Sequence, residues 1–540
     1  MRKIAIILVF VFTFTMFTGC SGKSSVKSEL NFMLTSSPNS ADPTLLFDTA
    51  GYTISKFFCC TLYEYNNKKQ LVPALAESYE LSDDGLTYIF HLRKDGKWSD
   101  GRPITAADFV FSFKRLADPN VGSNSVYFVT DCCKLKNVME IQAGEKPLSE
   151  LGVYAPDNET FVVELEEPCT FFLDLLTNNN FCPINEEFFY STGGKFGTSD
   201  ETVLSCGPFV IDRFEPLATQ IHFTKNPYYY NSDSITLSGV NLLVIPNEQQ
   251  ALMCYETGMV DIMQISGELT ELAIEDPEFT EFSGTTLYYI YINQRTSCAE
   301  LKNRNIRMAL SKSLDRKSLT DNLLKAGNIP ITRIIPLGFY TETDGSDFSR
   351  DQDKYNDYAA YDPESALSYW KQGLSELGIS SLKLGFCCNS DKVAVVEVLK
   401  DQMEKALPGL EIEINGVPFK ERISMRQSGE YDLMLSGWGP DFSDPTTYLA
   451  LFLSNSNAVT YSNEEYDRMY ATACSAEMAV NPESRNIVLH QLEDILLEDA
   501  ATIPLYVQGN TYLVRKNITG FQIPPKGSGI IINGINKEVG

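Results

Sequence analysis

Residues 90–101 read FHLRKDGKWSDG, and TAADFV follows at residues 105–110. Apolar and polar side chains alternate from Thr87 to Leu92, which predicts a half-buried strand. Two Asp-Gly pairs on either side of Trp98 are typical of turns. Thr105 with Asp108 three residues later predicts a capped helix, whose apolar stripe begins at Phe109. A strand, a turn and a helix in such close succession indicate mixed α+β structure.

Later segments carry the same kinds of signal. Asp362-Pro363-Glu364 predicts the start of a helix that Gly378 ends, and Asn481-Pro482-Glu483 repeats this start. His490 lies opposite the apolar stripe of the second helix, so we expect it to be solvated. Strand-like runs alternate with these helices from about residue 290, which favours an α/β domain; the runs are 382–386, 411–414, 431–436 and 503–507.

Length and charge exclude several classes of protein. The chain has 540 residues, of which 44 are basic and 71 acidic, for a net charge of −27. A chain of this length usually divides into more than one domain. Nucleic acids and anionic membrane surfaces bind clustered cations, so this acidic chain is a poor partner for either. We expect no nucleic-acid binding.

The first twenty residues have the parts of a secretory signal. Arg2 and Lys3 precede an apolar run at residues 4–17, which is shorter than the roughly 20 residues of a membrane span. Cys20 at the junction resembles a bacterial lipobox, although Phe17 stands where Leu is usual. The sequence therefore predicts a signal peptide over 1–19 and a lipidated Cys20 with a tether over 20–29. The alternative is an ordinary signal peptide with an incidental cysteine.

Motifs for enzymatic chemistry are missing. The only histidines are His91, His222 and His490, and the sequence contains no HExxH, GxSxG, P-loop or GxGxxG pattern. The cysteines that follow Cys20 include adjacent pairs but no CxxC, so no structural metal is expected. Buried free thiols are the favoured interpretation, and disulfides stay open. We expect neither an enzyme nor a cofactor.

One loop combines features of a binding site. Residues 436–445 read SGWGPDFSDP. Gly437 and Gly439 would let another backbone approach closely, Trp438 offers a flat apolar face, and Asp441 offers a carboxylate to an ammonium group. These are parts of a site for the amino terminus of an extended peptide. A glycine-rich turn with a core Trp438 and a solvated Asp441 is the alternative.

Several segments together strongly resemble the family 5 extracellular solute-binding proteins, which include the oligopeptide- and dipeptide-binding proteins of ABC importers. The resemblance extends over roughly residues 43–515. The matching segments are 75–79, 90–101, 105–110, 226–230, 304–310, 314–316, 437–446 and 453–456.

The resemblance implies an α/β (mixed α+β), two-lobed fold of the periplasmic-binding-protein-like class II type, with an extra domain and a cleft that closes about a hinge. It places domain I at 30–66, 200–287 and 509–540, domain II at 67–199, and domain III at 288–508. The crossings near residues 288 and 508 would form the hinge, and ligand would favour the closed state.

The resemblance also implies roles for individual residues. Asp441 would pair with the α-ammonium of a peptide, while backbone groups of Gly437 and Gly439 and the loop at 44–51 would bind its main chain. Phe419 stands where relatives place an aromatic side chain against the ligand, and Arg426 where a basic residue can face the peptide carboxylate. Phe419 in a core and Arg426 as a surface charge remain open. Leu435 departs from some oligopeptide binders, which carry Arg there.

The function implied is that of a monomeric, lipid-anchored peptide-binding protein on the outer face of the cell membrane or in the periplasm. It would deliver its ligand to a separate permease with ATPase subunits. Three alternatives stay open. One is another cargo, such as an oligosaccharide, nickel or haem; the others are a peptide-pheromone receptor and a hydrolase.

Overall fold

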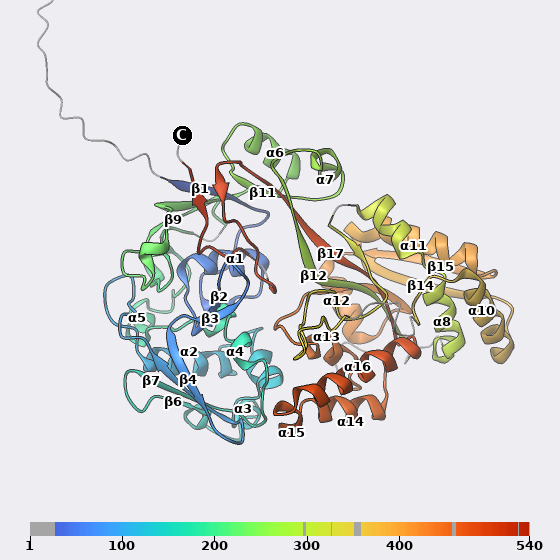
Figure 1. The fold of residues 1–540 in the computed structure, drawn as a ribbon, viewed down its shortest axis with the longest axis horizontal. Helices are drawn as coiled ribbons and strands as arrows, with labels where there is room; N and C mark the ends of the chain where they lie inside the picture. Colours follow the sequence, from blue (N-terminus) through green and yellow to red (C-terminus); the bar gives the residue numbers. More distant parts are fainter. Residues whose placement is uncertain are drawn as a thin grey trace, which may run out of the picture.

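The structure is a computed structural model that describes residues 28–538, apart from 216, 295–298, 326, 350–357, 456–460 and 528. The predicted signal peptide and Cys20 lie outside the described residues. The chain forms two lobes that lie side by side and are joined through one large sheet (Figure 1).

The large sheet has 11 strands in the described part of the chain and runs through both lobes. Its order is β15 (Leu410–Val417), β14 (Leu382–Asn389), β16 (Leu433–Trp438), β12 (Phe279–Ile292), β17 (Thr502–Val514), β11 (Ile262–Ile265), β1 (Glu29–Leu34), β10 (Gly239–Val244), β9 (Gln220–Lys225) and β8 (Phe209–Arg213), with β13 (Ile329–Pro330) beside β17.

Strands β12 and β17 connect the lobes. They pair antiparallel along most of their length, and β17 continues the sheet through β11 while β12 continues it through β16. Their register shifts between Phe282 and Thr286, where a Cβ on Gly284 would lie 1.7 Å from the carbonyl oxygen of Gln508. Glycine is therefore required at this bulge. The predicted crossings near residues 288 and 508 lie in these two strands, and the division into three domains stays a prediction.

The lobe on the left of Figure 1 contains a second sheet, in the order β4 (Ala76–Leu81), β5 (Thr87–Leu92), β7 (Thr160–Glu164) and β6 (Val153–Tyr154). β5 spans the predicted residues, and Thr105 and Asp108 form the predicted capping box at the start of α2 (Ala106–Ala117). Two small hairpins are β2 (Tyr63–Tyr65) with β3 (Leu71–Pro73) and β18 (Ile518–Thr519) with β19 (Asn536–Lys537). The helices from residue 49 to 273 are α1 (Thr49–Phe58), α2 (Ala106–Ala117), α3 (Val138–Gln142), α4 (Phe172–Leu175), α5 (Glu186–Ser191), α6 (Glu248–Glu256) and α7 (Gly267–Ala273).

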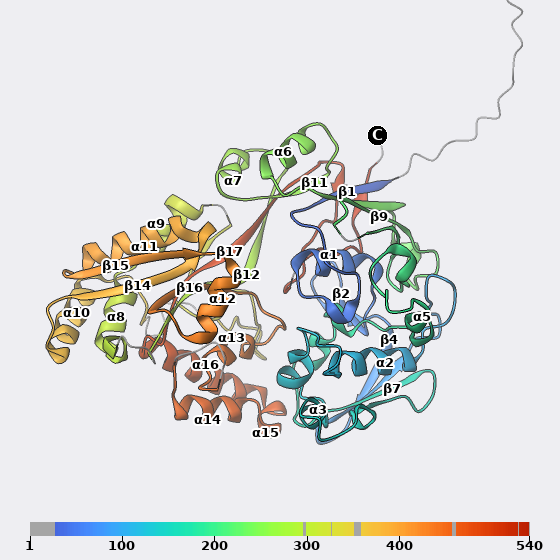
Figure 2. The same cartoon turned by 180° about the vertical axis from the view of Figure 1, so that it is seen from behind.

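The other lobe has helices on both faces of its part of the sheet (Figure 2). Leu433 and Leu435 of β16 pack into one core while Met434 packs into the other, which explains why this strand is apolar on both sides. The predicted start of α10 (Pro363–Leu377) is confirmed, since Asp362 accepts a hydrogen bond from the Ser365 amide. The helices are α8 (Arg304–Lys312), α9 (Arg316–Leu319), α10 (Pro363–Leu377), α11 (Val393–Ala406), α12 (Phe419–Ser428), α13 (Thr446–Leu449), α14 (Glu464–Ala473), α15 (Ala476–Ala479) and α16 (Pro482–Glu498).

The prediction that His490 is solvated is wrong. Its ring stacks on Phe348 at 3.9 Å between centroids, and its Nε2 lies 2.8 Å from Oε1 of Glu342. The segment that contains Glu342 and Phe348 covers this side of α16, and helical periodicity within α16 carries no information about that distant segment.

Candidate functional site

The end of β16 offers an open strand edge. On one side β16 pairs with β12 along its whole length, from Leu433 to Trp438. On the other side it pairs with β14 only through Leu433 and Met434. β14 runs on to Asn389 but does not pair with β16 beyond Met434, so among the described strands this side of β16 has no partner from Leu435 onward, and an extended chain could pair with it as an additional strand.

The glycines beside Trp438 have a structural role that the sequence did not indicate. A Cβ on Gly437 would lie 3.0 Å from Cζ of Tyr288, so glycine makes room for this ring against the strand. Gly439 is exposed, and a Cβ there would lie 3.3 Å from Oγ1 of Thr286. The structure thus explains Gly437 through packing within the protein, and leaves the proposed ligand contacts of both glycines as predictions.

Thr447 anchors both Trp438 and Asp441. The indole Nε1 of Trp438 donates to Oγ1 of Thr447 at 3.4 Å, and the backbone N–H of Asp441 donates to the same oxygen at 3.3 Å. Trp438 is half-buried against the core that contains Tyr289 and Phe452. Trp438 is therefore neither fully in the core nor free in solvent.

A buried ion pair at Asp444 fixes the C-terminal end of the loop at residues 436–445. Arg485 of α16 donates from Nη1 and Nη2 to the two carboxylate oxygens of Asp444 at 2.8 and 2.9 Å, and both side chains are 4% exposed. Burial alone would raise the pKa of Asp444, but Arg485 holds it below its usual range. Asp444 also accepts from the amide of Thr446, where α13 begins.

The carboxyl group of Asp441 lies between the lobes. Burial raises its pKa to about 6, and hydrogen bonding from Tyr127 and the charge of Lys526 oppose this shift. Burial is the main cause that raises the pKa of Tyr127 and of Tyr52, and the negative charge of Asp441 raises both further. The alternative of a fully solvated Asp441 therefore does not describe this structure.

Lys526 connects three parts of the chain next to Asp441. Its ammonium is 2.8 Å from Oδ2 of Asp174, 2.8 Å from the main-chain oxygen of Asp174, and 3.0 Å from the main-chain oxygen of Asp441. Only 3% of the Lys526 side chain is exposed. Asp174 also accepts from the hydroxyl of Tyr65 and, at 2.6 Å, from the amide of Ser443. These charges and amides connect the two lobes directly.

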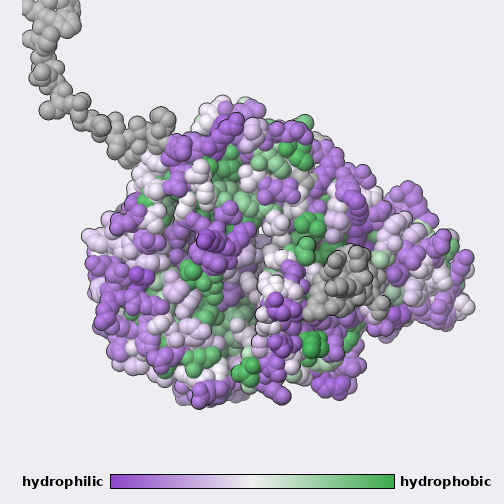
Figure 3. Space-filling view, viewed as in Figure 1, coloured by the Kyte–Doolittle hydropathy of each residue, from purple (hydrophilic) through white to green (hydrophobic). Residues whose placement is uncertain are grey.

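An aromatic pair lies next to this polar network. The rings of Phe171 and Phe442 stack at 3.7 Å between centroids with 5° between their planes. Asn178 adds a hydrogen bond to the main-chain oxygen of Asp441 at 3.2 Å. In the space-filling view only a narrow hollow separates the lobes (Figure 3). The lobes are therefore closed on each other in this structure.

Helix α12 carries the two remaining candidates. Phe419 is 62% exposed, so it is not a core residue. Arg426 is half-buried near Tyr289 and Tyr291, which argues against a simple surface charge. Its neighbour Arg422 is buried and donates to Oδ1 of Asn389 at 2.7 Å and to Oγ of Ser436 at 3.1 Å. The predicted ligand contacts of Phe419 and Arg426 stay predictions.

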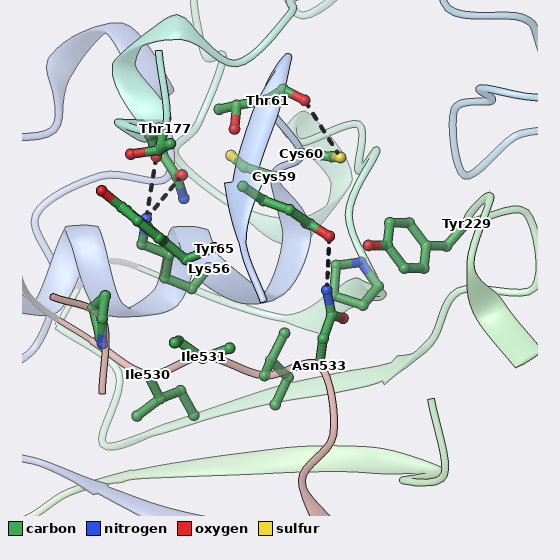
Figure 4. A pocket seen from close by; sticks show the side chains of 15 residues that line it. Lys56, Cys59, Cys60, Thr61, Tyr65, Thr177, Tyr229, Ile530, Ile531 and Asn533 are labelled. Carbon is green, nitrogen blue, oxygen red and sulfur yellow. Dashed lines mark hydrogen bonds between the residues drawn. The ribbon is translucent and has the colours of Figure 1, made fainter. Parts of the chain in front are cut away.

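A small cavity lies in the left lobe, next to α1, β2 and the C-terminal segment (Figure 4). Its volume is about 70 Å³, and Lys56 and Glu64 are among its lining residues. Burial lowers the pKa of Lys56 to about 8 and raises that of Glu64 to about 7. Tyr230 and Asn533 donate to Glu64 at 3.2 and 3.0 Å. The cavity is large enough for ordered water but not for a peptide.

Among the described residues, no group of three or more His, Cys, Asp or Glu side chains could hold a metal ion. Within the same part of the chain, no helix has the length and apolarity needed to cross a membrane.

A two-lobed mixed α/β fold with an open strand edge and a carboxylate between the lobes is typical of solute-binding proteins. Residues 70–460 match the bacterial extracellular solute-binding proteins, family 5 Middle, and the chain belongs to this family. The predicted family, fold class and non-enzymatic class are thereby confirmed.

Three relatives illustrate the similarity. The dipeptide-binding protein of Lactococcus lactis subsp. cremoris is 29% identical over 94% of this chain and 94% of its own length. The structure of Listeria monocytogenes OppA bound to peptide matches with a TM-score of 0.77 at 30% identity, over 95% of this chain and 100% of that one. The pheromone receptor PrgZ matches with a TM-score of 0.79 at 25% identity, over 95% of this chain and 100% of its own.

Proposed function

We propose that this protein binds peptides in an extended conformation between its lobes and delivers them to the permease of an ABC importer. The main observation behind this proposal is the unpaired edge of β16, which leads to the carboxylate of Asp441. Relatives named for dipeptide and oligopeptide binding support it.

Asp441 would bind the peptide's α-ammonium. Asp441, Asp174 and Lys526 together carry one excess negative charge, so a single ammonium group makes the cluster neutral. An ammonium enclosed without a carboxylate partner costs about 2–5 kcal/mol. This corresponds to a loss of roughly 30-fold to several thousand-fold in affinity when the carboxylate is removed.

The peptide backbone would pair with Leu435 to Gly439. Such main-chain hydrogen bonds do not depend on side-chain identity, so the protein would accept many sequences. From the opposite lobe, the loop at 44–51 presents Phe47, which is 56% exposed. Phe419 and Arg426 would contact the ligand farther along the strand, where Arg426 would face its carboxylate.

The cell-surface arrangement belongs to the same proposal. Cys20 would carry a lipid that holds a monomeric receptor on the outer face of the cell membrane or in the periplasm. A separate permease and its ATPase subunits would accept the peptide when the lobes open.

Native mass spectrometry of the purified protein tests this function, because peptides enclosed in the cleft can co-purify. We expect bound species whose masses match peptides and disappear after denaturation and refolding. Absence of such species, together with no thermal shift from a mixed peptide library, would contradict peptide binding.

A further inference from the structure

Two buried thiols face each other in the wall of the left lobe. Sγ of Cys182 lies 3.5 Å from Sγ of Cys206, and each residue is 2% exposed. Cys182 directly follows a short turn at residues 179–181, and Cys206 lies shortly before β8. Residues 24 positions apart in the sequence are thus held nearly at sulfur contact distance.

A backbone amide also reaches the sulfur of Cys206. The N–H of Cys60 donates to Sγ of Cys206 at 3.2 Å, and such a donor stabilises negative charge on sulfur. Cys59 also neighbours Cys182. A bond between the adjacent Cys59 and Cys60 would be strained, because adjacent cysteines cannot reach normal disulfide geometry easily.

We propose that Cys182 and Cys206 form a disulfide bond when the chain folds outside the cytoplasm. Membership in an extracellular protein family places the chain where disulfides persist. The required oxidant is a small-molecule or enzymatic disulfide.

The exchange proceeds in two steps. The thiolate of Cys182 attacks the oxidant disulfide and forms a mixed disulfide, which releases one thiolate. The thiolate of Cys206 then attacks the Cys182 sulfur and releases the second. The two cysteines lose two electrons and two protons, and the oxidant becomes two thiols.

The bond forms during folding rather than afterwards. Burial raises the pKa of both Cys182 and Cys206 in the folded protein, so the attacking thiolate is scarce there. The same burial would protect the completed bond from reducing agents.

The bridge would stabilise the wall of the cleft. Asn180, two residues before Cys182, donates to the main-chain oxygen of Pro43 at 3.0 Å, and Asn179 donates to Oγ of Ser55 in α1 at 2.7 Å. A disulfide here therefore anchors a turn that supports both the 44–51 loop and α1. Because Cys182 and Cys206 lie in the same lobe, closure of the lobes does not require the bond to break.

Tryptic peptide mapping of the full chain tests the proposal. The protein is refolded with reduced and oxidised glutathione, alkylated and digested without reduction. Cys206 is the only cysteine in the fragment 196–213, while Cys182 lies in 137–195 and Cys59 with Cys60 in 57–68. We expect 196–213 linked to 137–195, and this link should disappear in Cys182→Ala but persist in Cys169→Ala, since Cys169 shares the fragment 137–195.

An unlinked fragment 196–213, or its linkage to 57–68, would overturn the proposal, and both results come from the wild-type chain. As a second readout, dithiothreitol present from refolding onward should lower the Tm of the wild type by a few degrees. Cys206→Ala should no longer respond to the reductant, whereas Cys254→Ala, in α6, should respond like the wild type.

Discussion

The ammonium of Lys526 lies 2.8 Å from Oδ2 of Asp174 and 3.0 Å from the main-chain oxygen of Asp441. Lys526 comes from the C-terminal segment, Asp174 from α4, and Asp441 from the loop after β16. Since Asp441 belongs to the other lobe, this contact exists only when the lobes are closed. Lys526 therefore holds the lobes together at Asp441, the residue whose carboxylate is proposed to bind ligand.

Lys526→Met should weaken ligand binding. It removes the hydrogen bond that crosses the lobes to the main-chain oxygen of Asp441, and closure then encloses Asp174 without its cation; losing one partner of a buried pair costs about 2–5 kcal/mol. We expect peptide affinity, measured by calorimetry, to fall at least about tenfold. Lys537→Met is a matched control, because Lys537 also pairs with an aspartate, Asp261 at 2.7 Å, but its hydrogen bonds stay within one lobe. Equal affinities for the two variants would contradict a role of Lys526 in closure.

Affinity for a peptide with a free amino terminus should depend on pH through Asp441. Burial raises the pKa of this carboxyl from 3.8 to about 6 in the closed, unliganded protein. The ionised form that binds ammonium is therefore present above pH 6 and is lost as pH falls through that value. Calorimetry from pH 5 to 8 should show a decline below about pH 6.

Asp441→Asn provides the control for this pH dependence. Its affinity should be low and flat across the same range, even though Glu64 and Lys56 in the neighbouring cavity have pKa values of about 7 and about 8. The raised pKa also means that ionisation of Asp441 opposes folding of the ligand-free, closed protein. The stability difference between wild type and variant should therefore shift in favour of the variant as pH rises from about 4 to 6. A decline below pH 6 that persists in Asp441→Asn would assign it to another group.

Phe171 and Phe442 should contribute to closure through their stacked rings. Stacked aromatic pairs contribute about 0.5–1.5 kcal/mol beyond the area they bury. A double-mutant cycle with Phe171→Ala and Phe442→Ala, measured on peptide affinity, should give a coupling energy of about 1 kcal/mol. Strictly additive effects would show that the rings act independently in the ligand-bound state.

Gly284→Ala should disturb the strands that join the lobes. Its Cβ would lie 1.7 Å from the carbonyl oxygen of Gln508, so β12 or β17 must move. We expect a loss of about 1–3 kcal/mol in the free energy of unfolding. Gly385→Ala in β14 is the control, because its nearest contact, at 3.5 Å from the Asp432 carboxylate, is ordinary. Equal stability of the two variants in urea unfolding would contradict a tight bulge at Gly284.

The sequence predicted those features that depend on local chemistry. Strand β5, the capping box of α2 and the ends of α10 follow from alternation, capping residues and a terminal glycine, all of which act within a few residues. Asp441 and Trp438 were found because they share one short loop with two glycines.

Local sequence patterns could not predict the residues that contact the loop at 436–445. Lys526 contacts Asp441 from 85 residues away and Asp174 from 352 residues away, and an isolated Lys in a C-terminal segment has no distinguishing pattern. The fixed position of His490 has a similar origin, because the covering Phe348 comes from a distant segment. The Lys526 contact with Asp441 and the position of His490 both depend on packing between distant segments, which local propensity does not encode.

Asp441 is proposed to bind the amino terminus of a peptide lying along β16. Calorimetric comparison of one tripeptide with its N-acetylated form isolates this contact, since acetylation removes the ammonium and keeps the backbone. We expect the wild type to bind the acetylated peptide at least roughly 30-fold more weakly. Equal affinity for the two peptides would contradict the account.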